Sequence, residues 1–176
     1  MKTLVIVTHP DIEKSIINKR WIEELAKYPE KYTVHQLYKV YPDGKINVAR
    51  EQELMESYDK IVFQFPFYWF SSPPMLKQWL DEVVLYGWAY GSNSGFKLEG
   101  KKMSLAVTAG IDKEGYSESG EYKYTMNELF RPYELTFDYI KAKYEEPFVY
   151  YGIERDSSEE WIENSIPMYL EFLDQL

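Results

Sequence analysis

The chain alternates between short apolar runs, typical of buried strands, and longer segments with the apolar spacing of a helix. The first run, residues 2–8, is rich in β-branched residues and indicates a strand buried on both faces. Strands separated by helices form right-handed βαβ units and a parallel sheet. The sequence therefore predicts a single α/β domain, residues 1–176, with a five-stranded parallel sheet in the order 2-1-3-4-5 and helices on both faces.

The expected elements can be placed along the chain. We expect strands at residues 2–8, 32–37, 60–65, 101–108 and 146–151, and helices at residues 13–28, 48–58, 74–86, 124–141 and 157–176. Pro132 lies inside the fourth helix and should kink or split it, because proline has no backbone N–H. Asp156 or Ser157 should cap the last helix. The Gly- and Ser-rich segment 87–100 predicts a surface loop.

Composition excludes several classes of protein. The chain has no cysteine, which rules out disulfides, thiol catalysis and cysteine metal sites, and we predict no metal site. The net charge of −9 argues against binding to nucleic acid, which needs clustered Lys and Arg. No apolar run reaches the roughly 18 residues of a membrane span. The N-terminal run lacks a small-residue cleavage site, so we expect a cytoplasmic protein without a secretion signal.

Ligands of open parallel sheets bind beyond the carboxyl ends of the strands, where the strand order reverses. The loop after the first strand leads directly into a helix, whose first N–H groups and positive dipole end favour phosphate. This loop lacks the G-x-G-x-x-G pattern of dinucleotide sites. Its predicted ligand contacts are His9, Ser15, Ile16, Ile17 and Asn18. In the alternative interpretation, Ser15 only caps the helix.

The loop after the third strand contains four consecutive aromatic residues, which cannot all be buried in a small core. A flat heteroaromatic ring stacked on Trp69 would explain them, with backbone groups of the loop at the polar edge of that ring. The predicted contacts are Pro66, Phe67, Tyr68, Trp69 and Phe70. The alternative is a patch at a dimer interface, and the two interpretations are compatible.

The loop after the fourth strand supplies Thr108, Ala109, Gly110 and Ile111. Gly110 allows a close approach of backbone to ligand, and N–H groups there can stabilise developing negative charge, as in an oxyanion hole. Tyr116 follows and can donate a hydrogen bond to a carbonyl acceptor. We therefore predict catalytic roles for Gly110 and Tyr116, while an ordinary loop tyrosine remains the alternative for Tyr116.

With these loops, the sequence resembles the flavodoxin-like NAD(P)H:quinone oxidoreductases. It resembles especially their short bacterial branch, which includes ancillary flavoproteins of glutathione-gated potassium efflux systems and general stress oxidoreductases. The resemblance covers nearly the whole chain. It is carried by "THP" with "KSIINKR", "LYKVYPDGKINVAREQE", "FQFPFYWFSSPPMLKQWLDEVVLYGWAYG" and "LEGKKMSLAVTAG".

The resemblance implies a flavodoxin-like fold, bound FMN and ping-pong chemistry. NADH or NADPH would deliver hydride to flavin N5, and a quinone-like acceptor would then take it from the same place. FMN is expected rather than FAD, because the longer relatives that hold FAD carry extra C-terminal sequence. The resemblance also implies a homodimer with flavin pockets at the interface, and it places Trp88 and Tyr90 near the flavin of the other subunit.

Two departures from the family pattern lie on the acceptor side. The family usually reads T-T-G-G after the fourth strand, whereas this chain has Ala109 and Ile111 within that motif. Long relatives use a Tyr and a His further along the loop to handle protons. Tyr116 matches the Tyr, but the His position falls near Tyr122, so water or a tyrosine must supply any proton.

Two other functions remain as alternatives. The chain can be a regulatory module with little turnover, docked on a potassium efflux transporter at the inner face of the membrane. It can also be an electron-shuttling flavodoxin, although those proteins usually carry a Ser/Thr- and Gly-rich phosphate loop, unlike the loop at His9.

Overall fold

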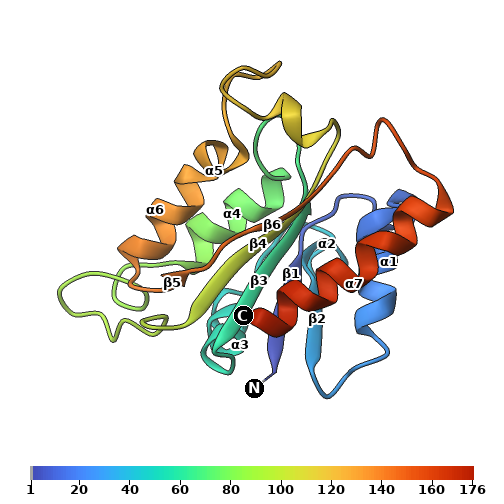
Figure 1. Cartoon of the computed structure of the whole chain (residues 1–176). Helices are drawn as coiled ribbons and strands as arrows, with labels where there is room; N and C mark the ends of the chain where they lie inside the picture. Colours follow the sequence, from blue (N-terminus) through green and yellow to red (C-terminus); the bar gives the residue numbers. More distant parts are fainter. Residues whose placement is uncertain (1) are drawn as a thin grey trace.

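The computed structural model describes residues 2–176, which form a parallel β-sheet with helices on both faces (Figure 1). The strands are β1 Thr3–Val7, β2 Tyr32–Gln36, β3 Lys60–Pro66, β4 Lys102–Ala109, β5 Lys143–Tyr144 and β6 Phe148–Tyr151. Their order is β2-β1-β3-β4-β5, with β6 also paired to β4, and all these pairings are parallel. The predicted order of a doubly wound sheet is confirmed.

Two short strands occupy the place of the predicted fifth strand. β5 pairs with the beginning of β4, and β6 pairs with its end. Between them, the Ser104 hydroxyl donates to the carbonyl oxygens of Glu145 and Glu146, at 3.2 and 2.9 Å. Pro147 has no N–H to contribute to a ladder. The Glu145 N–H still donates to the Met103 carbonyl at 2.9 Å, so a side-chain hydroxyl supplements the backbone pairing where the strand is interrupted.

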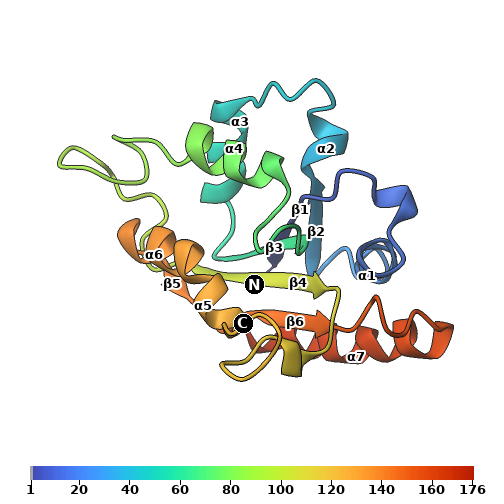
Figure 2. The same cartoon turned by 90° about the horizontal axis from the view of Figure 1, so that it is seen from above.

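Helices α1 and α7 cover one face of the sheet, and α3, α4 and α6 cover the other (Figure 2). The helices are α1 Ile17–Leu25, α2 Leu37–Val40, α3 Val48–Glu56, α4 Pro74–Val83, α5 Met126–Leu129, α6 Arg131–Tyr139 and α7 Glu159–Gln175, with short 3₁₀ turns at Ile12–Lys14 and Lys113–Gly115. Trp21 of α1 stacks on Tyr169 of α7, with ring centroids 4.3 Å apart. On the other face Trp79 of α4 packs on Phe63 of β3.

The first and fourth predicted helices are both divided. Helix α1 begins at Ile17 and not at residue 13, because Ser15 is extended (ψ 125°) and separates it from the 3₁₀ turn. The predicted break at Pro132 is confirmed. Helix α5 ends at Leu129, and Pro132 stands in the first turn of α6, where its missing N–H costs no hydrogen bond.

The predicted cap of the last helix is wrong by one or two residues. Ser158 is the N-cap of α7, and its side chain accepts a hydrogen bond from the Trp161 N–H at 3.2 Å. Asp156 instead accepts from the Ser158 N–H at 2.8 Å. Both side chains accept hydrogen bonds from the local backbone, so the sequence alone does not distinguish them.

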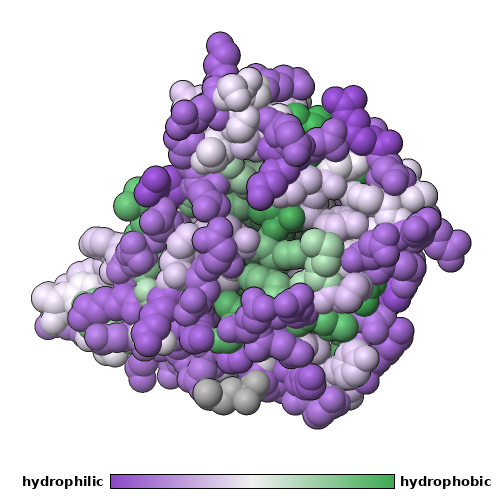
Figure 3. All heavy atoms as spheres, viewed as in Figure 1, coloured by the Kyte–Doolittle hydropathy of each residue, from purple (hydrophilic) through white to green (hydrophobic). Residues whose placement is uncertain are grey.

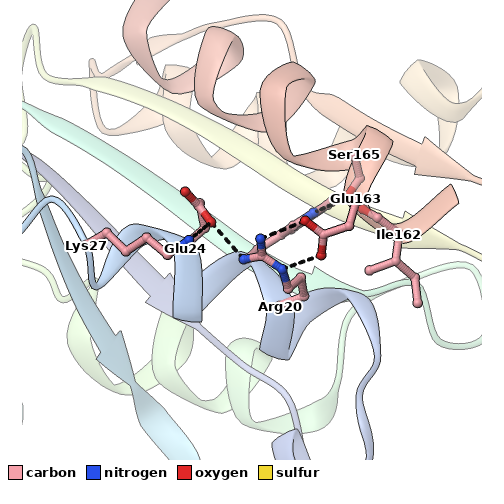
Figure 4. A network of polar contacts seen from close by, with 7 residues as sticks. Arg20, Glu24, Lys27, Ile162, Glu163 and Ser165 are labelled. Carbon is pink, nitrogen blue, oxygen red and sulfur yellow. Dashed lines mark hydrogen bonds and ion pairs between the residues drawn. The ribbon is translucent and has the colours of Figure 1, made fainter. Parts of the chain in front are cut away.

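A polar network joins α1 to α7 (Figure 4). The Arg20 guanidinium donates to both carboxylate oxygens of Glu163, at 2.6 and 2.8 Å, and to Glu24 at 2.8 Å. The Trp21 indole N–H donates to the Ser165 hydroxyl at 2.8 Å. A bidentate pair of this kind fixes orientation as well as distance. The network therefore holds α1, and with it the amino end of that helix, against α7.

A second polar cluster is buried between β2, α3 and α4. The Glu51 carboxylate is fully buried and accepts from Tyr41 at 2.6 Å and from the Trp79 indole N–H at 2.9 Å. His35 Nε2 lies 2.9 and 3.0 Å from its two oxygens. Burial pushes the pKa of Glu51 upward, but the hydrogen bonds from His35, Tyr41 and Trp79 outweigh burial and hold this pKa below its usual value.

The face seen in Figure 1 is mostly polar, with apolar side chains gathered near its middle (Figure 3). A groove beside β6 is lined by Phe148 and by Met168 of α7, whose side chain is half exposed. Strand β6 has only four residues, so its free edge offers a short template for pairing.

Within residues 2–176, none of the helices has the length and low polarity needed to cross a lipid bilayer.

Candidate functional site

The loops after β1, β3 and β4 lie beside one another, because these strands are neighbours in the sheet. The Thr8 N–H donates to the Gln64 carbonyl at 2.9 Å, and the Phe67 N–H donates to the Thr108 carbonyl at 2.9 Å. The rings of His9 and Tyr68 meet edge to face, with centroids 6.5 Å apart. The three loops singled out in the sequence therefore form one surface.

The amino end of α1 has free backbone donors. The Ser15 hydroxyl accepts from the Asn18 N–H at 3.0 Å, which is the capping contact of the alternative interpretation. Ile16 is the N-cap and has no capping side chain, and we find no partner for the N–H groups of Ile16 and Ile17 within residues 2–176. Such a helix end attracts anions through its free N–H groups and its dipole.

His9 lies in the loop that leads from β1 to this helix end and is half buried. Its Nδ1 accepts from the Asp11 N–H at 3.2 Å, which leaves Nε2 as the available donor. Burial lowers the pKa of His9, and the charge of Asp11 opposes that effect only in part. An anion bound beside the imidazole would favour its protonated form.

Asn18 and Thr108 lie in the floor of the site. The Asn18 amide donates to the Thr108 hydroxyl at 3.0 Å, and Gln64 Nε2 donates to the Asn18 backbone and side-chain oxygens at 3.2 Å. Tyr169 in turn donates to Gln64 at 2.8 Å. These side chains satisfy one another, so Asn18 and Thr108 join the first turn of α1 to the end of β4. A role for Gln64 was not predicted from the sequence, although a glutamine inside an apolar strand could have indicated one.

One hydroxyl at this end of the sheet has no partner among the described residues. The Thr8 Oγ1 atom is buried immediately after β1, and no hydrogen-bond partner is found for it among residues 2–176. Buried polar atoms are paired in most native structures, and exceptions occur at functional sites. The orphan hydroxyl lies beside the loop predicted to bind phosphate.

The aromatic loop after β3 is a strained two-residue turn. Tyr68 and Ser71 exchange backbone hydrogen bonds of 2.9 and 3.0 Å, and the central residues Trp69 and Phe70 have φ of 49° and 60°. Glycine or asparagine normally occupies such positions, and strain of this kind concentrates at functional sites. Trp69 is 93% exposed, while Tyr68 and Phe70 are about half exposed. The turn therefore presents an indole ring to whatever occupies the site.

The loop after β4 folds back on itself. Ala109 is fully buried, Ile111 is 9% exposed and Pro66 on the neighbouring strand is also buried. The Ile111 side chain packs so closely on Gly115 that a Cβ at residue 115 would lie 2.2 Å from it. The change from glycine to isoleucine at residue 111 thus adds an apolar side chain that the loop covers.

Tyr116 is buried among other aromatic rings. Its ring centroid lies 5.9 Å from that of Phe67, 5.1 Å from that of Tyr122 and 5.8 Å from that of Tyr151. Burial, supported by nearby Tyr122 and Glu154, raises the pKa of Tyr116 to about 12. Tyr116 is therefore a neutral hydrogen-bond donor near pH 7 and not a base.

Comparison with known proteins identifies the family. The model of a family described as having a flavodoxin-like fold matches residues 1–173. The chain belongs to this family. General stress protein 14 of Bacillus subtilis is 47% identical over 175 residues, which cover 99% of this chain and 98% of that protein. The potassium-efflux ancillary protein KefG of Erwinia tasmaniensis is 35% identical, with 94% of this chain and 95% of that protein covered.

Solved structures agree with this flavodoxin-like assignment. General stress protein 14 from Treponema denticola, in complex with FMN, has a TM-score of 0.93 and 45% identity, with 99% of both chains covered. An NADPH-quinone reductase from P. pentosaceus has a TM-score of 0.87 and 28% identity, with 98% of both chains covered. The resemblance to flavodoxin-like quinone oxidoreductases of the short bacterial type is confirmed.

Proposed function

We propose that this flavodoxin-like protein is an FMN-dependent NAD(P)H oxidoreductase whose acceptor is a quinone or a similar compound. The observation that carries the proposal is the meeting of a donor-rich helix end with a strained, exposed aromatic turn at one end of the sheet. A phosphate suits the first feature, and a flat ring suits the second. FMN contains both groups, and a relative with 45% identity is seen with FMN.

The residues present fit this cofactor. Its phosphate would be held by Ser15 and by the N–H groups of Ile16 and Ile17, with His9 Nε2 as a further donor. Its ring would lie between the Pro66–Phe70 turn and the 108–111 loop. When bound, FMN supplies two-electron hydride exchange between NAD(P)H and the acceptor. The buried Ala109 and Ile111 keep water from the loop, and the free face of Trp69 gives flat substrates a surface on which to stack.

The groups proposed to stabilise charge and to donate hydrogen bonds to the acceptor lie near the loop after β4. The Gly110 N–H can stabilise negative charge, as predicted for a catalytic role, and Tyr116 can donate its phenolic proton in a hydrogen bond to a carbonyl acceptor. Because the pKa of Tyr116 is raised to about 12, it orients an acceptor and polarises it without losing its proton near pH 7. We find no histidine in this loop, so water is the proposed source of the transferred proton.

A direct experiment tests the function. The purified protein should be yellow, release FMN on denaturation, lose its colour with NADH or NADPH, and regain it when menadione is added. Initial rates at varied NAD(P)H and menadione should give the parallel lines of a ping-pong mechanism. A colourless protein that does not bind added FMN would refute the proposal.

Replacement of Trp69 with alanine should weaken the binding of FMN by about fivefold to tenfold, the usual worth of one aromatic stacking contact. Trp69 is 93% exposed, so its removal should leave the melting temperature almost unchanged. Fluorescence titration of the apoprotein with FMN measures the effect. Tyr86→Ala is a matched control, because Tyr86 is also an exposed aromatic residue but lies after α4. Equal FMN affinity in Trp69→Ala and wild type would assign Trp69 to an interface instead.

A regulatory role on a potassium efflux transporter is the second candidate. It is favoured by the 35% identity to KefG, which is described as an ancillary protein of such a system. Turnover separates the two functions. Reduction of bound FMN by NAD(P)H, with negligible oxidation of NAD(P)H by any quinone, would favour the regulatory module over the enzyme.

We also propose that two copies form a homodimer through the groove between α4 and α6. Apolar and aromatic side chains line this groove, including Phe70, Leu80, Tyr90 and Tyr139. Leu135 and Tyr139 are 62% and 69% exposed and line the same groove, and contiguous exposed apolar side chains of this kind mark interaction sites. The groove is continuous with the aromatic turn through Phe70, so a second copy would approach the flavin site. Sedimentation of the protein as a monomer at micromolar concentration would contradict this proposal.

A further inference from the structure

The loop after β6 crosses the loop after β4 and is fixed to it by backbone hydrogen bonds. The Gly152 N–H donates to Ala109 and Ile111 at 3.0 and 3.1 Å, and the Glu154 N–H donates to the Gly110 carbonyl at 2.9 Å. The position of Glu154 is therefore set by the same loop that is predicted to meet the polar edge of the flavin.

The Glu154 side chain lies directly over Gly110. A Cβ built on Gly110 would lie 2.5 Å from Glu154 Oε1 and 2.8 Å from its Cδ. The space beside the Gly110 Cα is thus occupied by a carboxylate from another loop. Glycine at residue 110 permits this approach, because any other side chain would displace Glu154.

Among the described residues, 2–176, this carboxylate has no neutralising partner. Within residues 2–176 we find no ion pair or hydrogen bond from the Glu154 side chain, whereas the adjacent Arg155 lies 3.7 Å from Asp112. Glu154 is exposed, and it lies against the loop after β4 at Gly110. Its negative charge also helps to raise the pKa of Tyr116, in addition to the effects of burial and of Tyr122. A negative charge without an ion-pair partner among residues 2–176 therefore lies beside Gly110, on a backbone that is held by the loop after β4.

We propose that Glu154 lowers the reduction potential of the bound flavin by holding a negative charge beside Gly110. This inference rests on the proposed FMN-dependent function. Hydride transfer from NAD(P)H moves two electrons and one proton, so it adds one negative charge to the site until a second proton follows. A carboxylate near the developing charge disfavours the reduced state by Coulomb repulsion. A lower potential favours the onward transfer of the electrons to an acceptor.

The test is the midpoint potential of bound FMN, measured against reference dyes in the FMN-loaded protein. In Glu154→Gln, the affinity for reduced FMN relative to oxidised FMN should rise by about tenfold. For a two-electron couple, this ratio corresponds to a midpoint potential about 30 mV more positive. Glu154→Asp keeps the charge and should restore a potential close to that of wild type. The difference between Glu154→Gln and wild type should shrink at 1 M salt, because salt screens exposed charges.

Glu30→Gln is the matched control, because it removes the same charge just before β2, at the opposite end of the sheet. It should leave the potential unchanged. An FMN-loaded Glu154→Gln variant with the wild-type potential, or an equal shift in Glu30→Gln, would overturn the role of Glu154 alone. A wild-type protein that does not retain FMN would overturn the proposed function together with this inference.

Discussion

Replacing Glu51 with alanine should lower the free energy of unfolding by about 3–5 kcal/mol, the usual cost of removing one member of a buried, hydrogen-bonded charge cluster. Glu51 is the shared acceptor for Tyr41, Trp79 and His35, at distances between 2.6 and 3.0 Å. Alanine would leave three polar groups in an apolar region without a partner. Urea denaturation followed by circular dichroism measures the change.

Two further variants make this prediction sharper. Glu53→Ala changes an exposed glutamate of the same helix and should alter stability by less than about 0.5 kcal/mol. Glu51→Gln keeps the shape but removes the charge. Because the pKa of Glu51 is lowered in the folded protein, its charge stabilises the fold above the unfolded pKa of about 4.3. That stabilisation is lost as the pH falls through the folded pKa.

The stability difference between wild type and Glu51→Gln should therefore be largest near pH 7, and it should shrink as the pH falls below the unfolded pKa of about 4.3 and through the lowered folded pKa. A loss of less than about 1 kcal/mol in Glu51→Ala would show that water replaces the carboxylate, and that the cluster contributes little to folding.

Replacing Ile16 with proline should weaken the binding of FMN by about tenfold to a hundredfold. The change removes one backbone N–H that is proposed to donate to the phosphate, and a hydrogen bond to a charged group contributes about 1.5–3 kcal/mol. Ile16 has φ of −82°, close to the proline value, and Ser15 before it is extended at φ −77° and ψ 125°. Proline is therefore compatible with the fold at this position.

Ile16→Ala is the matched control, because it removes the same half-exposed side chain but keeps the N–H. Both variants should melt within a few degrees of wild type, and only Ile16→Pro should lose affinity in a fluorescence titration with FMN. Equal dissociation constants for the two variants would show that the amino end of α1 does not hold the phosphate.

The positions of β1 to β4 and of the three ligand loops could be predicted because they depend on local patterns. β-branched apolar runs indicate buried strands, and Pro132 was sufficient to predict the division between α5 and α6. The family resemblance predicted that the protein binds FMN and that it is related to quinone reductases. The short α2 and the cap at Ser158 were not predicted, because each depends on competition between nearly equivalent hydrogen bonds. The break at Pro147 was also missed, although a proline without an N–H was a local signal for it.

By itself, the sequence determined the order of elements, the doubly wound class of sheet, and the segments that meet at its carboxyl edge. These properties follow from hydrophobic periodicity and from the handedness of βαβ connections, which are local and general. Only the tertiary structure decided which side chains face the site. It placed Asn18 and Thr108 in the floor, Trp69 in solvent and Glu154 over Gly110. Such contacts join residues up to 90 positions apart, so no local pattern can encode them.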